Sequence, residues 1–519
     1  MNSGDRPPTA TRVSGTVNEN AATPSRPQSR PADAVGSGVA IGRVALSYTD
    51  MDNSSTAVIV GHLRAFIENA APGVRLPSTR QLVTDYAASP VTVQKALRLL
   101  DAEGLVESRP GVGTFVRTPR STLPPDYRWQ TAALGAPRHT LPKVAGALRT
   151  APPEAQALHS GYPEPELLPE RLVRAALIRA ARGAAATTRP PASGLHELRA
   201  WFATEVADAT AADLSAPTAN DVIIVPGSQS GLTSIFRALI APGQPLLIES
   251  PTYWGAILAA HQAGVRLTPI ASDADGPDPD KLDRSLRETG ARALYAQPNY
   301  ANPTGAQWSA DRALEVLTVM REHGAFLIED DWAHDFGIET SPRPLAAQDE
   351  AGHVVYLRSL TKSVSPTIRV GAVVARGPLL QRLLGERSAE SLYVSGLIQQ
   401  AALEVVTDPG WRSHLRRLRP QLRERRNLLV ASLRDHAAAL HIDRIPQGGI
   451  HLWARLPDGT DVDRLLRDCE TDGVWVASGH EWFPTEPSGP YLRLNFTGPN
   501  PTGYPAAART LTAAIASQQ

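Results

Sequence analysis

The feature that most constrains the fold is an alternation of short apolar runs with amphipathic segments, which continues from about Ala155 onward. The run "DVIIVPG" (residues 221–227), for example, leads directly into "SQSGLTSIFRALIAPG" (residues 228–243). A strand followed at once by a helix, repeated along the chain, predicts a mostly parallel sheet covered by helices. From about Leu379 the pattern changes to long charged helices followed by short strands, which indicates an α+β subdomain.

The chain is too long for one ordinary core. Its 519 residues suggest roughly three units, at about 150 residues per domain. Residues 1–50 are poor in large apolar groups and rich in Pro, Ser, Thr, Ala and Asn, so we expect a disordered tail. We expect a small unit over residues 51–120, a proline-rich linker over 121–154, and a large domain over 155–519.

Charge and cysteine content exclude several classes of protein. There are 52 basic and 52 acidic residues, so the whole chain carries no polyanion-binding signature and any nucleic-acid surface must be local. Cys469 is the single cysteine and cannot form an internal disulfide, and neither a signal peptide nor a membrane span is apparent. We therefore expect a cytoplasmic protein without a membrane partner. The 13 histidines show no zinc-binding spacing, so no metal site is predicted.

The small unit is basic although the chain is neutral, with eight Lys and Arg against five Asp and Glu from residue 54 to residue 120. Ser78 followed by Gln81 predicts a capping box at the start of one helix. Ser89 and Pro90 supply an N-cap and a first-turn proline for a second helix. The run "VESRPGVGTFV" (residues 106–116) alternates around a turn, which predicts a β-wing with Arg109 near its tip.

The second helix of this unit has one apolar stripe, which predicts a buried face made of Val93, Ala96, Leu97 and Leu100. Thr92, Lys95 and Arg98 then face outward, where they can enter a DNA major groove. Exposed basic residues are also typical of an ordinary solvated helix face. From the residues alone, a helical interaction domain therefore remains open beside a DNA-binding one.

A lysine stands just past a β-branched run in "HVVYLRSLTKSVSPTIRVG", residues 353–371. Because Val354–Leu357 reads as a buried strand, Lys362 should lie beyond its carboxyl end, where open α/β sheets gather their ligands. A desolvated lysine loses its proton readily and can form a Schiff base with a carbonyl. A surface lysine is the ordinary alternative.

Other strand ends carry the groups that a pyridoxal phosphate site requires. Ser228 and Gln229 begin a helix, where free N–H groups attract phosphate, although an ordinary helix cap has the same pattern. "AFLIEDDW" ends a strand in Glu329, Asp330 and Asp331, and a carboxylate there requires a cation. Tyr253 is a candidate stacking ring or an ordinary packing residue, and Asn302 is a candidate polar contact or an ordinary turn residue. Ser359 and Arg369 are candidate phosphate contacts.

The small unit resembles the winged helix-turn-helix of GntR-type transcription regulators in its sequence "RLPSTRQL…TVQKAL…EGL…G.GTFV". That resemblance implies a DNA operator as partner and makes Arg80 and Thr92 the expected DNA contacts, followed by Lys95 and Arg98. One departure is visible. The family usually has Val-Ser-Arg at the start of the second helix, whereas this chain has Ala88-Ser89-Pro90, so one customary arginine contact is missing.

The large domain resembles the fold-type I aminotransferases through "NPTG" and "SLTKSVSPTIRVG", and its fusion to a GntR-like head resembles the MocR subfamily of regulators. The resemblance implies pyridoxal 5'-phosphate on Lys362, with Asp330 as the pyridine partner and Asn302 beside the phenolic oxygen. It also implies that Arg493 in "YLRLNF" holds the carboxylate of a substrate or effector. Trp332 stands where these proteins commonly have a tyrosine that helps to set the charge of the phenolic oxygen.

Three functions are compatible with these patterns. The first is a dimeric transcription regulator whose aminotransferase-like domain senses an amino compound or the cofactor itself. The second is a working aminotransferase with an accessory head, and the third is a DNA-binding protein whose large domain only dimerises. The complete head favours the first over the second, and the retained lysine, aspartate and arginine favour it over the third.

Overall fold

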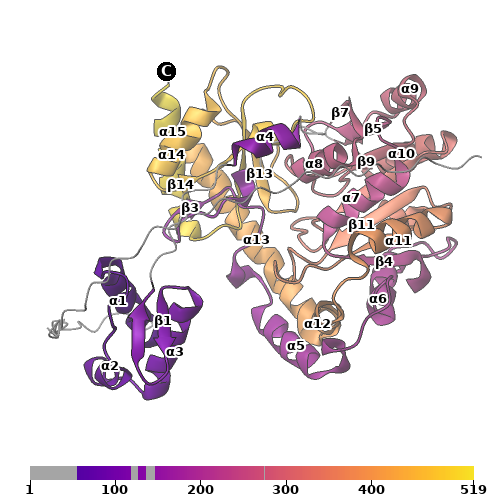
Figure 1. The fold of residues 1–519 in the computed structure, drawn as a ribbon. Helices are drawn as coiled ribbons and strands as arrows, with labels where there is room; N and C mark the ends of the chain where they lie inside the picture. The colour runs from indigo at the N-terminus through magenta and orange to yellow at the C-terminus, as the bar shows by residue number, and fades with distance from the viewer. Residues whose placement is uncertain (1–54, 118–126, 136–145, 274, 519) are drawn as a thin grey trace, which may run out of the picture. The chain divides into compact units, whose positions relative to one another are not determined.

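The computed structural model describes residues 55–117, 127–135, 146–273 and 275–518 (Figure 1). The chain divides into two compact units, residues 1–133 and 134–519. The tail expected over residues 1–50 lies outside the described residues, and so do parts of the linker expected over 121–154. The described part of that linker range contains helix α4 (Arg128–Leu134) and the 3-10 turn η1 (Gly146–Leu148).

The first unit is a winged helix-turn-helix (Figure 1). Its elements are α1 (Ser55–Asn69), α2 (Thr79–Asp85), α3 (Pro90–Ala102), β1 (Val106–Arg109) and β2 (Gly113–Val116). The two strands pair antiparallel around a turn in which Gly111 has a φ of 73°, a conformation that glycine adopts without a steric penalty. The stripe predicted for α3 is buried against α1, so this unit has an apolar core of its own.

The caps of α2 and α3 explain where these helices begin. Ser89 accepts a hydrogen bond from the backbone N–H of Thr92 at 3.1 Å and Pro90 occupies the first turn, as predicted. Ser78 accepts from the N–H of Gln81 at 3.2 Å. The predicted capping box is only half formed, however, because the amide of Gln81 donates to Asp85 at 2.8 Å instead of returning to the cap.

The second unit is built on a seven-stranded sheet with the order β4-β12-β11-β10-β9-β5-β6. The strands are β4 (Val222–Val225), β12 (Gly371–Val374), β11 (Val354–Ser359), β10 (Phe326–Asp331), β9 (Ala293–Ala296), β5 (Pro245–Glu249) and β6 (Arg266–Ile270). Only β12 runs antiparallel to its neighbours within this sheet, so the predicted mostly parallel sheet is confirmed.

Helices cover both faces of this sheet. They are α5 (Glu170–Arg182), α6 (His196–Ala207), α7 (Ser228–Leu239), α8 (Trp254–Ala263), α9 (Pro279–Thr289), α10 (Ala310–Glu322), α11 (Pro378–Ser391) and α12 (Gly396–Thr407). Successive strand residues point to opposite faces: Val225 belongs to one core with α7, α8 and α11, and Ile224 to the other with α5, α6, α9, α10 and α12.

The C-terminal part of the second unit is the predicted α+β subdomain (Figure 1), but it begins near Pro409 rather than near Leu379, because α11 and α12 pack on the central sheet. The strands β13 (His451–Arg455), β16 (Tyr491–Asn495) and β15 (Ala477–Ser478) form an antiparallel sheet packed with α13 (Pro409–His436), α14 (Val462–Thr471) and α15 (Tyr504–Ala516). A segment from early in the domain joins it, because β3 (Gln156–Ala157) pairs in parallel with β14 (Val474–Trp475).

Candidate functional site

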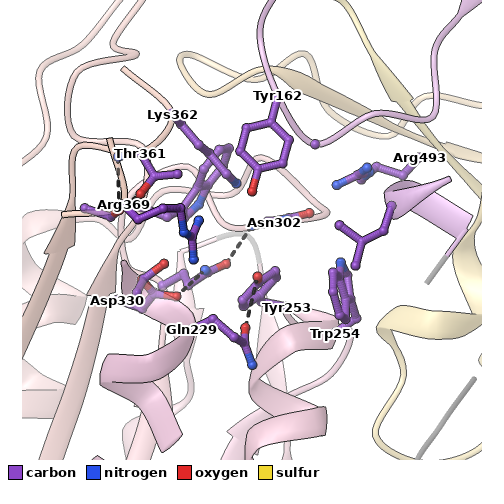
Figure 2. A pocket seen from close by; sticks show the side chains of 16 residues that line it. Tyr162, Gln229, Tyr253, Trp254, Asn302, Asp330, Thr361, Lys362, Arg369 and Arg493 are labelled. Carbon is purple, nitrogen blue, oxygen red and sulfur yellow. Dashed lines mark hydrogen bonds between the residues drawn. The ribbon is translucent and has the colours of Figure 1, made fainter. Parts of the chain in front are cut away.

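A cavity of about 200 Å³ lies at the carboxyl ends of the central strands (Figure 2). All nine residues that the sequence nominated in the large domain line it: Ser228, Gln229, Tyr253, Asn302, Asp330, Ser359, Lys362, Arg369 and Arg493. They come from six separate stretches of the sequence, and more than 260 residues lie between the first and the last of them. The carboxyl ends of the parallel strands share one edge and bring most of these residues together, whereas Arg493 comes from β16 of the antiparallel sheet.

Lys362 lies three residues beyond β11, with its amino group 4.1 Å from the centre of the Trp332 ring. No ion pair or hydrogen bond joins this amine to another described residue. Burial lowers the pKa of Lys362 to about 7, and the positive charge of Arg493 acts in the same direction, whereas Asp330 opposes it. Near neutral pH a large share of this lysine is therefore the uncharged, nucleophilic amine.

Of the three acidic residues that end β10, only Asp330 lines the cavity. Glu329 instead accepts the backbone N–H groups of Leu345 and Ala346, both at 3.0 Å. Asp331 is paired with His334 at 2.6 Å. The apolar run before these three adjacent carboxylates does not show which of them faces the cavity. The structure shows that Asp330 does.

Asp330 is held by one oxygen and free at the other. Its Oδ2 accepts from the Tyr295 hydroxyl and from the Gln297 amide, each at 2.8 Å, while its buried Oδ1 has no partner. Burial raises the pKa of Asp330 to about 6, and its hydrogen bonds and the charge of Lys362 reduce that rise. A buried carboxylate oxygen without a partner is costly, so a cationic N–H placed against it would be strongly favoured.

The start of α7 is a cradle for an anion. Gly227 has a φ of 83°, which favours glycine, and a Cβ there would lie 2.8 Å from the Arg369 guanidinium, so a larger residue would strain the backbone and displace the arginine. Ser228 follows at the first helical position, where backbone N–H groups lack partners within the helix. Arg369 makes no ion pair with a described residue, and its only recorded bond is a long one, 3.5 Å, to the Pro226 carbonyl.

Gln229 and Tyr253 are bonded to one another. The Tyr253 hydroxyl donates to the Gln229 side-chain oxygen at 3.2 Å, and the Gln229 amide donates to the carbonyl of Gly255 at 2.7 Å. The side chain of Gln229 is therefore occupied, and its backbone N–H is the group left for an anion. Tyr253 lines the cavity with its hydroxyl tethered in this way (Figure 2).

Arg493 has no carboxylate partner within 4.0 Å among the described residues. One of its terminal nitrogens donates to the backbone carbonyls of His159 and Ser160, at 2.7 and 3.2 Å. Burial lowers the pKa of Arg493 to about 9. A buried guanidinium that faces a cavity and has no acidic partner among the described residues is suited to a ligand carboxylate.

Trp332 makes no polar contact with the cavity. Its indole N–H donates to the backbone carbonyl of Tyr300 at 3.1 Å, and its ring stacks on His451 at 5.4 Å between centroids. The only polar hydrogen of this residue is therefore directed into the protein. Trp332 contributes a ring beside Lys362 and provides none of the hydrogen bonding that a tyrosine at this position would offer.

The sequence interpretation missed further residues of the cavity wall, namely Leu148, Gly161, Tyr162, Trp254, Gln297 and Thr361. Gln297 directly follows β9, so the strand-end rule that found Asp330 could also have found it. Thr361 accepts a hydrogen bond from the Ser359 hydroxyl at 3.0 Å and precedes the lysine. Leu148 and Tyr162 precede the first strand of the central sheet, so no strand pattern marks them.

In the first unit the predicted DNA contacts are exposed or partly exposed on α2 and α3. Arg80 and Lys95 have no acidic partner among the described residues. Within the described residues, Arg98 bonds only to the Gln94 carbonyl, at 3.4 Å. The Thr92 hydroxyl is 2.8 Å from the Ser89 hydroxyl, so it completes the cap and remains at the surface.

The basic residues with acidic partners in this unit lie elsewhere. Arg64 of α1 pairs with Glu103, Arg109 with Glu107 at the wing, and Arg117 with Asp101, at 2.8, 3.3 and 3.8 Å respectively. Among the described residues of the winged helix-turn-helix, the cations without an acidic partner are therefore Arg75, Arg80, Lys95 and Arg98, of which the last three lie on α2 and α3. Unpaired surface cations are the groups that replace the counterions of a phosphate backbone.

The free groups of the cavity fit pyridoxal 5'-phosphate. An unpaired amine matches its aldehyde, an orphaned carboxylate oxygen matches its pyridine N–H, and a helix start beside a free arginine matches its phosphate. The fold and the cavity thus define a winged helix-turn-helix joined to an aminotransferase-like domain.

Comparison with known families agrees with that class. The model of aminotransferase class I and II matches residues 162–510, and that of the bacterial regulatory proteins of the gntR family matches residues 56–116. This chain belongs to the aminotransferase class I and II family and carries a GntR-type head, the combination of the MocR subfamily.

Individual relatives include both regulators and enzymes. The chain is 29% identical to the probable rhizopine catabolism regulatory protein MocR of Rhizobium meliloti, over 86% of this chain and 88% of the relative. It is 30% identical to a 2-aminoadipate transaminase of Thermus thermophilus, over 68% and 88%. Among solved structures, the α-aminoadipate aminotransferase LysN of Thermus thermophilus, complexed with N-(5'-phosphopyridoxyl)-L-leucine, matches with a TM-score of 0.65 and 27% identity, over 70% of this chain and 93% of that one.

The GntR-type head implies that the chain binds DNA. Within the part of the chain that the structure describes, no helix combines the length and the apolar character needed to cross a membrane.

Proposed function

We propose that this chain is a transcription regulator that binds its operator through the GntR-type head and senses an amino compound, or the cofactor itself, in the aminotransferase-like domain. The observation that carries the proposal is that both units keep charged groups unpaired. Among the described residues, α2 and α3 of the head carry cations without acidic partners, and the cavity has an unpaired amine, a carboxylate oxygen without a partner and a guanidinium without an acidic partner.

Pyridoxal 5'-phosphate is the proposed ligand of the cavity. Lys362 would hold it covalently, Asp330 would face its pyridine nitrogen, and Asn302 its phenolic oxygen. The ring of Tyr253 would provide a further contact. The anion cradle would be formed by Ser228, Gln229, Ser359 and Arg369. When bound, this cofactor supplies an imine that an amine can exchange and that withdraws electrons from the carbon next to the amine nitrogen.

The proposed effector is an amino compound with a carboxylate. Arg493 would hold the carboxylate, because its guanidinium lies at the cavity with no acidic partner in the described residues. The amine of the effector would then lie toward Lys362, on the same side of the cavity (Figure 2). A compound that engages both groups is distinguished from one with an amine or a carboxylate alone.

A working aminotransferase with an accessory head is the alternative. An aminotransferase must move a proton at the substrate, which depends on contacts that tune the phenolic oxygen. Trp332 directs its N–H to the Tyr300 carbonyl, so it supplies no such contact. That observation favours a long-lived bound state rather than rapid turnover. A sensor requires a long-lived bound state.

The test is to recover sheared genomic DNA with the purified full-length protein and to sequence what it retains. We expect enrichment of a discrete sequence with two related half-sites, because a dimer would present two heads. Retention without any enriched sequence would contradict the regulator proposal. The same preparation, supplied with pyridoxal phosphate, should become yellow.

A further inference from the structure

Trp482 lies behind the cavity wall and contacts two of the residues that are proposed to bind the cofactor and the effector. It ends the 3-10 turn η6 (Gly479–Trp482), and its side chain is fully buried. Its neighbours are the other rings of a small aromatic cluster, among them Trp453 at 6.3 Å between centroids. Besides these apolar neighbours, Trp482 contacts two polar side chains, those of Asn302 and Arg493.

The first contact fixes the orientation of the Asn302 amide. The indole N–H of Trp482 donates to Oδ1 of Asn302 at 3.1 Å. Because an indole can only donate, the amide oxygen must face Trp482, and the NH2 group must be directed away from it. Among the described residues nothing accepts a hydrogen bond from that NH2 group, and Asn302 lines the cavity. The donor is thus held ready for an anionic oxygen in the cavity.

The backbone of Asn302 is tied to the other side of the cavity. Its N–H donates to the Gln297 side-chain oxygen at 2.9 Å, and the Gln297 amide donates to Asp330 at 2.8 Å. Trp482, Asn302, Gln297 and Asp330 therefore form a continuous hydrogen-bonded chain. Rotation of the Asn302 amide would break the link to Trp482 and leave the rest intact.

The second contact is with the guanidinium of Arg493. Its central carbon lies 4.6 Å from the centre of the Trp482 ring. A guanidinium over an indole face is held by a cation–π attraction and by the planar contact itself. Because backbone carbonyls hold only one terminal nitrogen of Arg493, the ring is the surface that orients the rest of the group.

We propose that Trp482 is a positioning residue that orients two groups at once, the Asn302 NH2 toward the phenolic oxygen of the cofactor and the Arg493 guanidinium toward the carboxylate of the effector. This inference rests on the proposed function, since it assumes pyridoxal phosphate in the cavity. The N–H of the indole serves the first group and its ring face serves the second, so the two roles separate by substitution.

The experiment uses the full-length protein loaded with pyridoxal phosphate and follows the visible absorption of the bound cofactor as a function of pH. Trp482→Phe keeps a ring but removes the N–H, so the Asn302 amide is free to turn its oxygen toward the cofactor. We expect the pKa of the chromophore to rise by about one unit, because the deprotonated phenolic oxygen loses a donor.

Binding of 3-phenylpropionate, a carboxylate without an amine, reports on Arg493 in the same preparations. We expect Trp482→Phe to leave its dissociation constant within about twofold and Trp482→Leu to weaken it about tenfold, because only leucine removes the ring face. Trp453→Phe is the matched control for the chromophore, since Trp453 belongs to the same aromatic cluster and makes no hydrogen bond to Asn302. It should leave the pKa of the chromophore unchanged.

A double-mutant cycle identifies the route of the effect. In an Asn302→Ala background, Trp482→Phe should cause no further shift of the chromophore pKa. A shift of the same size in that background, no shift in the single variant, or an equal shift in Trp453→Phe would overturn the proposal. If the wild-type protein forms no visible band, the proposed cofactor fails as well, whereas a normal wild-type band with an unshifted Trp482→Phe refutes this inference alone.

Discussion

The GntR-type head and the aminotransferase-like domain, here called the body, both leave charged side chains without partners. These side chains are at the surface in the head and are buried around a cavity in the body. In the described part of the head the unpaired groups are exposed and mostly positive, as with Arg80 and Lys95 on α2 and α3. In the body they are of both signs and enclose a cavity, as with Lys362, Asp330 and Arg493. An exposed unpaired cation costs little free energy, whereas a buried unpaired charge costs several kcal/mol.

The difference indicates what each site requires of a ligand. The head needs only a surface of negative charge, and its affinity should therefore depend strongly on salt. The cavity needs a ligand with a fixed set of complementary groups, and burial displaces the pKa values of its own groups: it lowers the pKa of Lys362 and raises that of Asp330. A substitution of a single DNA-contact residue in the head should then leave the cofactor band of the large domain unchanged.

The largest effect is expected for Lys362→Ala. Wild-type protein supplied with pyridoxal phosphate should show a visible band that borohydride fixes, and the variant should lose the band completely, because no other amine lines the described cavity wall. The chain has only four lysines, Lys95, Lys143, Lys281 and Lys362, so peptide mapping after reduction can assign the label.

Lys281→Ala is the control for this experiment, because Lys281 is exposed and pairs with Asp278 at 3.3 Å. It should retain the full band. A borohydride label on any lysine other than Lys362, or a band that persists in Lys362→Ala, would contradict the assignment of the cavity.

The next effect concerns the connection between the units. A fragment that ends near Arg120 contains the head with its own core and should fold, yet it should bind the operator weakly. The full chain should bind about 10²–10⁴-fold more tightly if a dimeric body presents two heads to two half-sites. Titration of one operator fragment with both proteins measures the ratio, and equal affinities would show that the body adds nothing to DNA binding.

A smaller effect is expected for the double variant Arg80→Ala, Thr92→Ala in the full chain. Operator affinity should fall about 10- to 100-fold, and the slope of log affinity against log salt should decrease by about one for the lost cation. The cofactor band should be unchanged. Arg64→Ala, which removes a cation already paired with Glu103, should stay within about twofold of wild type. Unaltered operator binding in the double variant would show that α2 and α3 do not read the DNA as proposed.

The smallest effect is a dependence on pH. The neutral amine is the reactive form of Lys362, and its pKa is about 7, so covalent capture should accelerate as pH rises through 7 and then level off. Between pH 8 and pH 6 the capture rate should fall about tenfold. Arg493→Leu removes a positive charge that helps to lower this pKa, so its midpoint should move to higher pH. A midpoint near the ordinary value for lysine in wild-type protein would contradict the buried, uncharged amine.

Much of the fold could be predicted because its signals are local. The caps at Ser78 and Ser89 and the apolar stripe of α3 depend on residues a few positions apart, and all are present in the structure. The strand-end positions of Asp330 and Lys362 also follow from local apolar runs. The capping box failed in part because Gln81 had a competing partner, Asp85, one turn further along the helix.

The rest of the site depends on contacts that no local pattern contains. Trp482 lies 180 residues after Asn302, and only the packing of the C-terminal subdomain brings them together. Strand alternation also does not say which face of β10 holds the cavity, so only the family resemblance singled out Asp330 from Glu329 and Asp331. The direction of the Trp332 N–H likewise depends on a backbone carbonyl 32 residues earlier in the chain.

The most direct test of the central claim, that the body senses and the head reports, is to measure operator affinity and product formation together. The full-length protein loaded with pyridoxal phosphate is mixed with a panel of amino acids, amines and keto acids at fixed salt. We predict that at least one amino compound changes both the cofactor spectrum and the operator affinity, with little or no turnover. Sustained turnover at about one per second or faster, without any change in operator affinity, would contradict the account and identify the protein as an aminotransferase with an accessory head.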